Sequence, residues 1–180
     1  MGSMRLNRTL NTLKKREQGF TLVELIAVVA IIAMIAIYVT IEINQSTDDA
    51  KVGLATAFLA SNVPGAISSY RSRNLGSCRD INNDEGASEE KLPALPENDT
   101  SGVIKQRLVK RGLAARTPWD DIWKVEYSGE TKLITLTYPI KGSKADLIAE
   151  DLAANLTGTG QVEEVTEKSA ENFTVTYSCS

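Results

Sequence analysis

A long uncharged apolar run near the N-terminus constrains this chain more than any other feature. Fifteen consecutive residues, Leu25–Val39, contain no charge, no Gly and no Pro. Adding Phe20–Glu24 gives twenty residues, and a helix of about 20 residues spans the roughly 30 Å hydrocarbon layer of a bilayer. An acid at bilayer depth costs about 2.5–3.5 kcal/mol on insertion scales, so the sequence predicts a functional role for Glu24.

The residues on either side of this run set its orientation. The residues before Gly19 include one acid, Glu17, and five bases: Arg5, Arg8, Lys14, Lys15 and Arg16. Positive charge on one side of an apolar segment keeps that side in the cytoplasm. A secretory signal peptide would carry its small-residue cleavage site after the apolar run, and the residues 40–45 (TIEINQ) match such a site poorly.

The order of residues at the start of the run is specific. The segment KREQGFTLVELIAVVAIIAMIAIYV places Gly19, Phe20, Thr21 and Glu24 ahead of unbroken apolar sequence. It resembles the N-terminal signature of type IV pilins and of type II secretion pseudopilins. The resemblance implies that a prepilin peptidase cuts after Gly19 and methylates Phe20. It also implies that Glu24 pairs with the terminal amine of an adjacent subunit, with Thr21 either orienting that amine or capping the helix.

Composition argues against catalysis and against a dominant nucleic-acid function. The chain has a net charge of −3, 42% hydrophobic residues and no histidine. Histidine is the commonest general base and metal ligand, and no HExxH, P-loop or GxGxxG pattern occurs. We therefore expect no enzyme, no cofactor and no metal site.

The two cysteines, Cys78 and Cys179, enclose most of the C-terminal region. An even cysteine count in a domain exported to an oxidising compartment indicates a disulfide. Type IV pilins characteristically fasten a C-terminal region in this way, so the resemblance agrees.

Periodicity predicts an α+β fold behind the apolar segment. An amphipathic helix continues the first one to about Arg73, with a kink or early end at Pro64-Gly65 and a stop at Gly76. An exposed loop follows over 78–101, and Thr100 or Ser101 caps a short helix that runs to about Gly112. The remaining expected elements are strands 122–127 and 132–138 as a hairpin, a helix over 143–156, and strands 162–165 and 173–177. We expect the antiparallel sheet to cover one face of the long helix.

These elements give a domain organisation. We expect a cytoplasmic leader (1–19), a transmembrane and filament-core helix (20–44), an amphipathic half of the same helix (45–75) and a globular head (76–180) that contains the 78–179 bridge. The order and the wide cysteine span look most like type IVb pilins, the toxin-coregulated, bundle-forming and thin conjugative pilus subunits. Two residues depart from family habits. Phe20 is a type IVa first residue, and Ile41 stands where type IVa pilins carry a helix-breaking Pro.

A basic cluster and two tryptophans complete the candidates. The cluster comprises Lys105, Arg107, Lys110, Arg111 and Arg116. We interpret it as a solvated helix face or as a salt-bridge partner for an acidic neighbouring subunit, in preference to phosphate contacts with DNA. Trp119 and Trp123 are expected to fill the core beside the hairpin.

The resemblance implies the major subunit of a type IV pilus, held in the inner membrane as a precursor and then assembled into an extracellular filament of identical copies. Its implied partners are the prepilin peptidase, an assembly ATPase with its inner-membrane platform, and an outer-membrane secretin. A minor pilin or type II secretion pseudopilin is the alternative within this superfamily. A membrane-anchored periplasmic binding domain is the alternative from another class.

Overall fold

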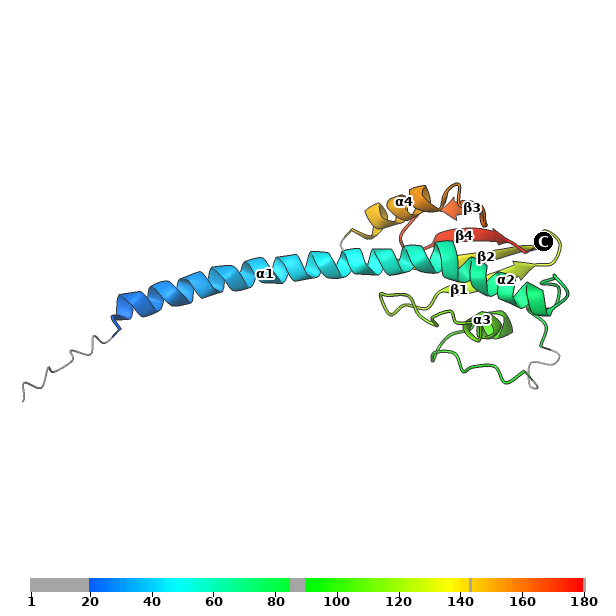
Figure 1. The fold of residues 1–180 in the computed structure, drawn as a ribbon, viewed down its shortest axis with the longest axis horizontal. Coiled ribbons are helices and arrows are strands. Elements are labelled where there is room, and N and C mark those ends of the chain that lie inside the picture. The colour runs from blue at the N-terminus through cyan, green and yellow to red at the C-terminus, as the bar shows by residue number, and fades with distance from the viewer. Residues whose placement is uncertain (1–19, 85–89, 143, 180) are drawn as a thin grey trace, which may run out of the picture. The chain divides into compact units, whose positions relative to one another are not determined.

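The computed structural model describes residues 20–84, 90–142 and 144–179. Contacts divide the chain into two compact units, Met1–Ile43 and Asn44–Ser180. Helices and one antiparallel sheet confirm the predicted α+β class. The elements shown in Figure 1 are α1 (Leu22–Ala57), a π-helical turn η1 (Phe58–Asn62), α2 (Val63–Arg73), α3 (Gly102–Val109), β1 (Lys124–Ser128), β2 (Leu133–Tyr138), α4 (Ala145–Leu156), β3 (Val162–Glu167) and β4 (Phe173–Ser178).

The first unit contains the N-terminal part of α1. Its segment Leu22–Thr40 has a mean hydropathy of 2.8 and is long and apolar enough to cross a membrane. None of this segment is buried inside the structure. Backbone hydrogen bonds within the helix satisfy its peptide groups, which is the condition for a spanning segment in lipid.

A four-stranded sheet in the order β1-β2-β4-β3 organises the second unit, and every neighbouring pair is antiparallel. The predicted hairpin is confirmed as β1 and β2. Alternate residues of β2 are buried, namely Ile134, Leu136 and Tyr138, as the period of two in a strand requires. Helix α4 contacts β3 at one edge of the sheet, and α3 contacts β1 at the other (Figure 1).

The long helix is irregular at a different place from the one predicted. It continues to Arg73 as expected, but the break in its hydrogen-bond pattern is η1, which precedes Pro64. There the backbone N–H of Val63 donates to the carbonyl of Phe58, five residues back. Because Pro64 has no N–H for the Ala60 carbonyl, the ladder rearranges on its N-terminal side and the helix passes through the proline.

This rearrangement leaves the carbonyl of Leu59 without a helical donor. Val63 is committed to Phe58, and Pro64, the donor that a π pattern would use, has no N–H. The hydroxyl of Tyr177 in β4 donates to the Leu59 carbonyl at 2.9 Å, and both residues are buried. A residue near the C-terminus therefore satisfies the backbone group that Pro64 orphans.

Aromatic side chains bind the π turn to the sheet. The ring of Phe58 lies 5.6 Å from that of Trp123 and 5.3 Å from that of Tyr138, centroid to centroid. Trp123 is fully buried, and Trp119 is partly buried against the same core. The expected core position is confirmed for both tryptophans.

Candidate functional sites

The first candidate site is the start of α1. The hydroxyl of Thr21 and its backbone N–H both donate to Oε2 of Glu24, at 2.9 and 2.8 Å. The backbone N–H of Glu24 donates back to the Thr21 hydroxyl at 3.3 Å. This reciprocal pattern is a capping box, in which a residue before the helix and an acid three residues later satisfy each other's backbone donors. Of the two roles considered for Thr21, the structure therefore shows the cap.

The capping box fixes the carboxylate of Glu24 at the positive end of the helix dipole. Both hydrogen bonds from Thr21 end on Oε2, so Oε1 remains for a donor from outside. Phe20 precedes the helix and is 84% exposed, whereas Gly19 lies outside the described residues. The arrangement presents a carboxylate beside the first residues of the helix, where a terminal amine at Phe20 would also lie.

The helix behind this acid offers only apolar surface. Between Leu22 and Val39 its large side chains are exposed by 45–76%. A contiguous apolar surface of this size marks a surface for lipid or for another protein. The helix is apolar all round, so one partner on one face does not cover it.

The second candidate site is the disulfide. Cys78 follows α2, Cys179 follows β4, and the structure joins them across 101 residues. Both cysteines are buried, and the backbone N–H of Cys179 donates to the carbonyl of Lys132 at 2.9 Å. The bridge fastens the last strand to the end of the long helix.

The basic cluster differs from the interpretation of it as a solvated helix face. Lys105 is fully buried, and its Nζ lies 2.5 Å from a carboxylate oxygen of Asp99 and 2.6 Å from the carbonyl of Trp123. The same ammonium stands 4.2 Å from the ring centroid of Trp123. Ser101 occupies the cap position of α3, but its hydroxyl points to Trp123 and makes no cap hydrogen bond.

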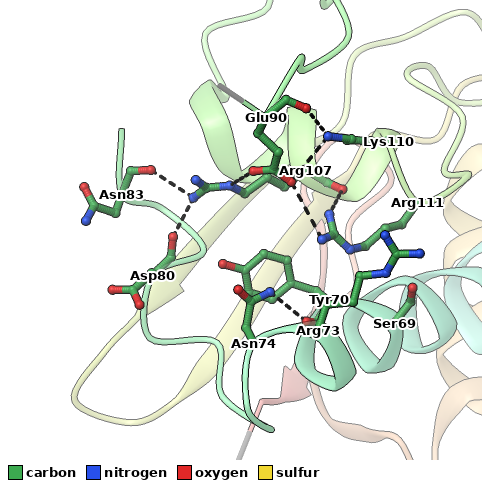
Figure 2. A pocket seen from close by; sticks show the side chains of 10 residues that line it. All are labelled: Ser69, Tyr70, Arg73, Asn74, Asp80, Asn83, Glu90, Arg107, Lys110 and Arg111. Atoms are coloured by element: carbon green, nitrogen blue, oxygen red, sulfur yellow. Dashed lines mark hydrogen bonds and ion pairs between the residues drawn. The ribbon is translucent and has the colours of Figure 1, made fainter. Parts of the chain in front are cut away.

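Arg107 is buried as well, and it holds the loop that follows the disulfide cysteine. Its Nε donates to Glu90 at 2.9 Å, and its Nη1 donates to the backbone carbonyls of Asp80 and Asn83 (Figure 2). The same Nη1 also donates to the carbonyl of Ile81 at 3.0 Å. These contacts neutralise the charge and satisfy its donors, as burial of a guanidinium requires. The buried half of the cluster therefore stabilises the head itself.

Lys110 and Arg111 line an open cleft of about 810 Å³, together with the buried Arg107. Lys110 makes ion-pair contact with Glu90 at 3.7 Å, and Arg111 stacks over the ring of Tyr70 at 4.6 Å. Arg116 pairs with Asp120, away from the cleft. The lining residues come from α2, the following loop and α3: Ser69, Tyr70, Arg73, Asn74, Asp80, Asn83, Glu90, Arg107, Lys110 and Arg111 (Figure 2).

No local signal in the sequence identifies this split. Lys105 and Lys110 lie in the same short basic segment, and only the position of their partners separates them. Asp99 and Glu90 belong to a loop whose path the periodicity does not predict. An acidic, turn-rich loop precedes the basic helix in the sequence, but this order does not say which charges meet.

Comparison with known proteins bears on the first site. Residues 14–40 match the family described as Prokaryotic N-terminal methylation motif. Neither the curated proteins nor the solved structures give a match to the chain. The matched segment contains the Gly19–Phe20 junction, the capping box and the exposed apolar helix. The motif supports a type IV pilin-like protein, and the α+β fold behind it is consistent with the type IV pilin fold.

Proposed function

We propose that this chain is the major structural subunit of a type IV pilus. One observation carries the proposal: the apolar segment Leu22–Thr40, which has no buried residue, carries a carboxylate in a capping box in its first turn and lies inside a methylation motif. The motif itself fits a pilin, a pseudopilin or a similar subunit. The assignment to the major type IVb class is the finer part of the proposal and rests on the order of elements and the 78–179 bridge.

The apolar helix has two successive environments in this proposal. In the precursor it lies in the inner membrane, with residues 1–19 in the cytoplasm and the head outside. In the filament it packs against the same helix of several neighbours, and apolar burial contributes about 25 cal/mol per Å². Contacts of this kind between identical copies do not close on themselves, so they build an open fibre.

Processing supplies the group that Glu24 lacks. Cleavage between Gly19 and Phe20 creates a terminal amine, which the peptidase then methylates. A charged amine and a carboxylate are each costly alone in an apolar surrounding, and pairing relieves both. The capping box holds Oε2, and Oε1 receives the amine of an adjacent subunit. The pair sets the register of one subunit against the next.

The energy and route of assembly come from other proteins. The prepilin peptidase, an assembly ATPase with its membrane platform and an outer-membrane secretin are the partners of the proposed pathway. The chain itself contributes shape, apolar surface and one placed charge.

The first test is intact-mass and N-terminal analysis of the protein from sheared extracellular fibres of its native host. An abundant species that begins at N-methylated Phe20 and carries a closed disulfide supports the proposal. A mature species confined to the inner membrane, or present only in traces in fibres, indicates a pseudopilin or a minor pilin instead. An uncut chain excludes the pilin function and favours a membrane-anchored binding domain.

A matched pair of variants separates the two roles of Glu24. Glutamine at this position keeps the capping box, because its amide oxygen accepts the same hydrogen bonds, but it removes the charge. We expect both Glu24→Gln and Glu24→Ala to be cleaved and to lose fibre assembly. Fibres of Glu24→Gln at the wild-type level would show that the cap alone matters and that no charge pair forms.

A further inference from the structure

The head carries opposite charges at the two edges of its sheet. Strand β3 forms one edge, and its exposed acids are Glu163, Glu164 and Glu167. Exposed Glu150 and Asp151 lie on α4, which contacts β3. The cationic cleft is lined by α2, α3 and the loop between them, and α3 contacts β1, the strand at the opposite edge of the sheet. The width of the sheet separates the two surfaces within one subunit.

Among the described residues that line the cleft, cations outnumber acids. Its lining includes four cations, Arg73, Arg107, Lys110 and Arg111, against the carboxylates of Asp80 and Glu90. Glu90 already lies within 4 Å of three of those cations. Arg73 is exposed and has no ion pair among the described residues.

Arg111 is the clearest example of a cation in this cleft that lacks a close carboxylate partner. Its side chain is only 10% exposed, its contact with Glu90 is a long 3.8 Å, and its Nε has no acceptor in the described part of the chain. Burial lowers the pKa of this guanidinium, Glu90 and Tyr70 oppose that effect, and the charges of Arg73 and Arg107 add to it. A buried cation in this state is stabilised by an additional carboxylate.

The β3 edge carries acids that lack cationic partners within the described part of the chain. In the described ranges Glu163, Glu164 and Glu167 make no ion pair with this chain's bases. The pairing of β3 with β4 shifts register twice along this strand, and acids and bulges on an edge strand oppose pairing with a further strand. A partner that engages this edge is therefore recognised through its side-chain charge.

We propose that the acidic β3 edge of one subunit binds the cationic cleft between α2 and α3 of a second copy. The inference rests on the proposed filament, which brings copies of the head together. Because the two surfaces lie at opposite edges of the sheet, the contact is heterologous and propagates from copy to copy. The carboxylates of the β3 edge form ion pairs with Arg73, Lys110 and Arg111 of the second copy. These pairs help to set the register between subunits, in addition to the packing of the apolar helices.

The test is a charge swap in the full-length chain, expressed in the native host without its chromosomal copy. One variant carries Arg73→Glu and Lys110→Glu, a second carries Glu164→Lys and Glu167→Lys, and a third combines all four changes. All four positions are exposed, and closure of the disulfide in each variant is the check that the head still folds. The control reverses Lys124 and Glu130, exposed residues that line neither surface.

Like charges facing each other across an interface are strongly unfavourable, so we expect each two-site variant to lose about tenfold or more of its sheared fibre. The four-site variant reverses both surfaces and is expected to recover fibre to within about twofold of wild type. Wild-type fibres are expected to shed subunits as salt is raised, because exposed ion pairs are screened.

Two readouts separate this inference from the proposed function. Cleavage at Gly19 and closure of the disulfide are measured in the membrane fraction of every variant, and they are expected to stay at wild-type levels. Unchanged fibre in the two-site variants, or a four-site variant no better than either, overturns the head contact and leaves the pilin function standing. Absence of wild-type fibre overturns both.

Discussion

Apolar side chains are exposed in the N-terminal segment and buried in the head. In Leu22–Thr40 every side chain is exposed, and this segment has no partner among the described residues of its own unit. In the described part of the second unit, Asn44–Ser180, 27 hydrophobic residues are buried, and a lysine and an arginine are buried with them. The second unit covers its own apolar side chains, whereas the segment leaves an apolar surface for lipid or for another protein to cover.

The two regions also neutralise their acids over different distances. Glu24 finds its donors three residues away, in the first turn of its own helix. Glu90 pairs with Arg107, 17 residues away and in another element. The charge of the segment is therefore fixed as soon as a helix forms, and the charges of the head are fixed only when the head folds.

The largest expected effect comes from breaking the buried pair in the head. Lys105→Met leaves Asp99 buried without its cation, and we expect the free energy of unfolding to fall by about 3–5 kcal/mol. Urea unfolding of the detergent-solubilised full chain, followed by tryptophan fluorescence, measures the loss, since both tryptophans lie in the head.

The double variant Lys105→Met with Asp99→Leu is the control for this pair. It removes both charges, so we expect it to recover most of the loss. A double variant as unstable as the single one would show that the ammonium acts through Trp123 and not through Asp99.

The disulfide is the next largest contribution to the head. Replacing Cys78 and Cys179 by alanine frees a loop across 101 residues, and loss of a bridge of this kind costs about 2–5 kcal/mol. The same urea experiment measures it, and reduced wild-type protein should match the variant. Membrane insertion of the apolar segment should not change. Loss of insertion would mean that the two units do not act independently.

A charge placed in the apolar segment should impair membrane insertion and leave the stability of the head unchanged. Ile32→Lys adds about 2.5–3.5 kcal/mol to the cost of insertion, so less of the protein should stay in membranes after alkaline extraction. The urea midpoint of the head should be that of wild type. Ile32→Leu is the matched control, and wild-type retention of the lysine variant would argue against a membrane-spanning segment.

Two buried tyrosines on neighbouring strands allow a comparison of a hydroxyl with a hydrogen-bond partner and a hydroxyl without one in the described residues. Tyr177→Phe leaves the Leu59 carbonyl unsatisfied and should cost about 1–3 kcal/mol. Tyr138 is equally buried, but its hydroxyl has no partner in the described residues, so Tyr138→Phe should be neutral or slightly stabilising. Equal losses in both variants would show that the Tyr177 hydroxyl does not support the π turn.

The smallest expected effect is a loss of head stability in acid. Burial alone would raise the pKa of Glu90, but the hydrogen bond and charge of Arg107, with the charges of Lys110 and Arg111, hold it below its ordinary value. Burial and Lys105 act in the same opposed way on Asp99, whose pKa is also lowered. The folded state then binds fewer protons than the unfolded state, so stability present above the ordinary carboxyl values near pH 4 is lost as the pH falls below them.

Unfolding midpoints between neutral pH and about pH 3 check this dependence. Glu90→Gln should lower stability at neutral pH and flatten the acid decline. An unchanged slope in that variant would exclude Glu90 as a source of the decline.

Much of the fold could be predicted because local periodicity of apolar residues indicates each helix and strand. The alternation of β2 and the apolar spacing of α4 identified these elements, and both hairpin strands were found within a few residues of their observed ends. The Pro64-Gly65 pair predicts an irregularity in the long helix, but the structure places it at η1, before the proline. A proline removes a known hydrogen bond, whereas the side on which the helix rearranges depends on Phe58 and Tyr177 finding their places in the core.

The apolar segment and the even pair of cysteines can be recognised in the sequence alone, because they depend on local order and composition, whereas the role of Thr21 stayed open between two alternatives. The structure was needed to show that Thr21 caps the helix, that Lys105 and Arg107 are buried while Lys110 is not, and that Tyr177 reaches Leu59 across 118 residues. A side chain's charge is fixed by its identity, but its partner depends on how distant segments meet when the core closes. The charge partners in the head can therefore be assigned only from the structure, whereas the apolar character of the N-terminal segment is evident from its sequence.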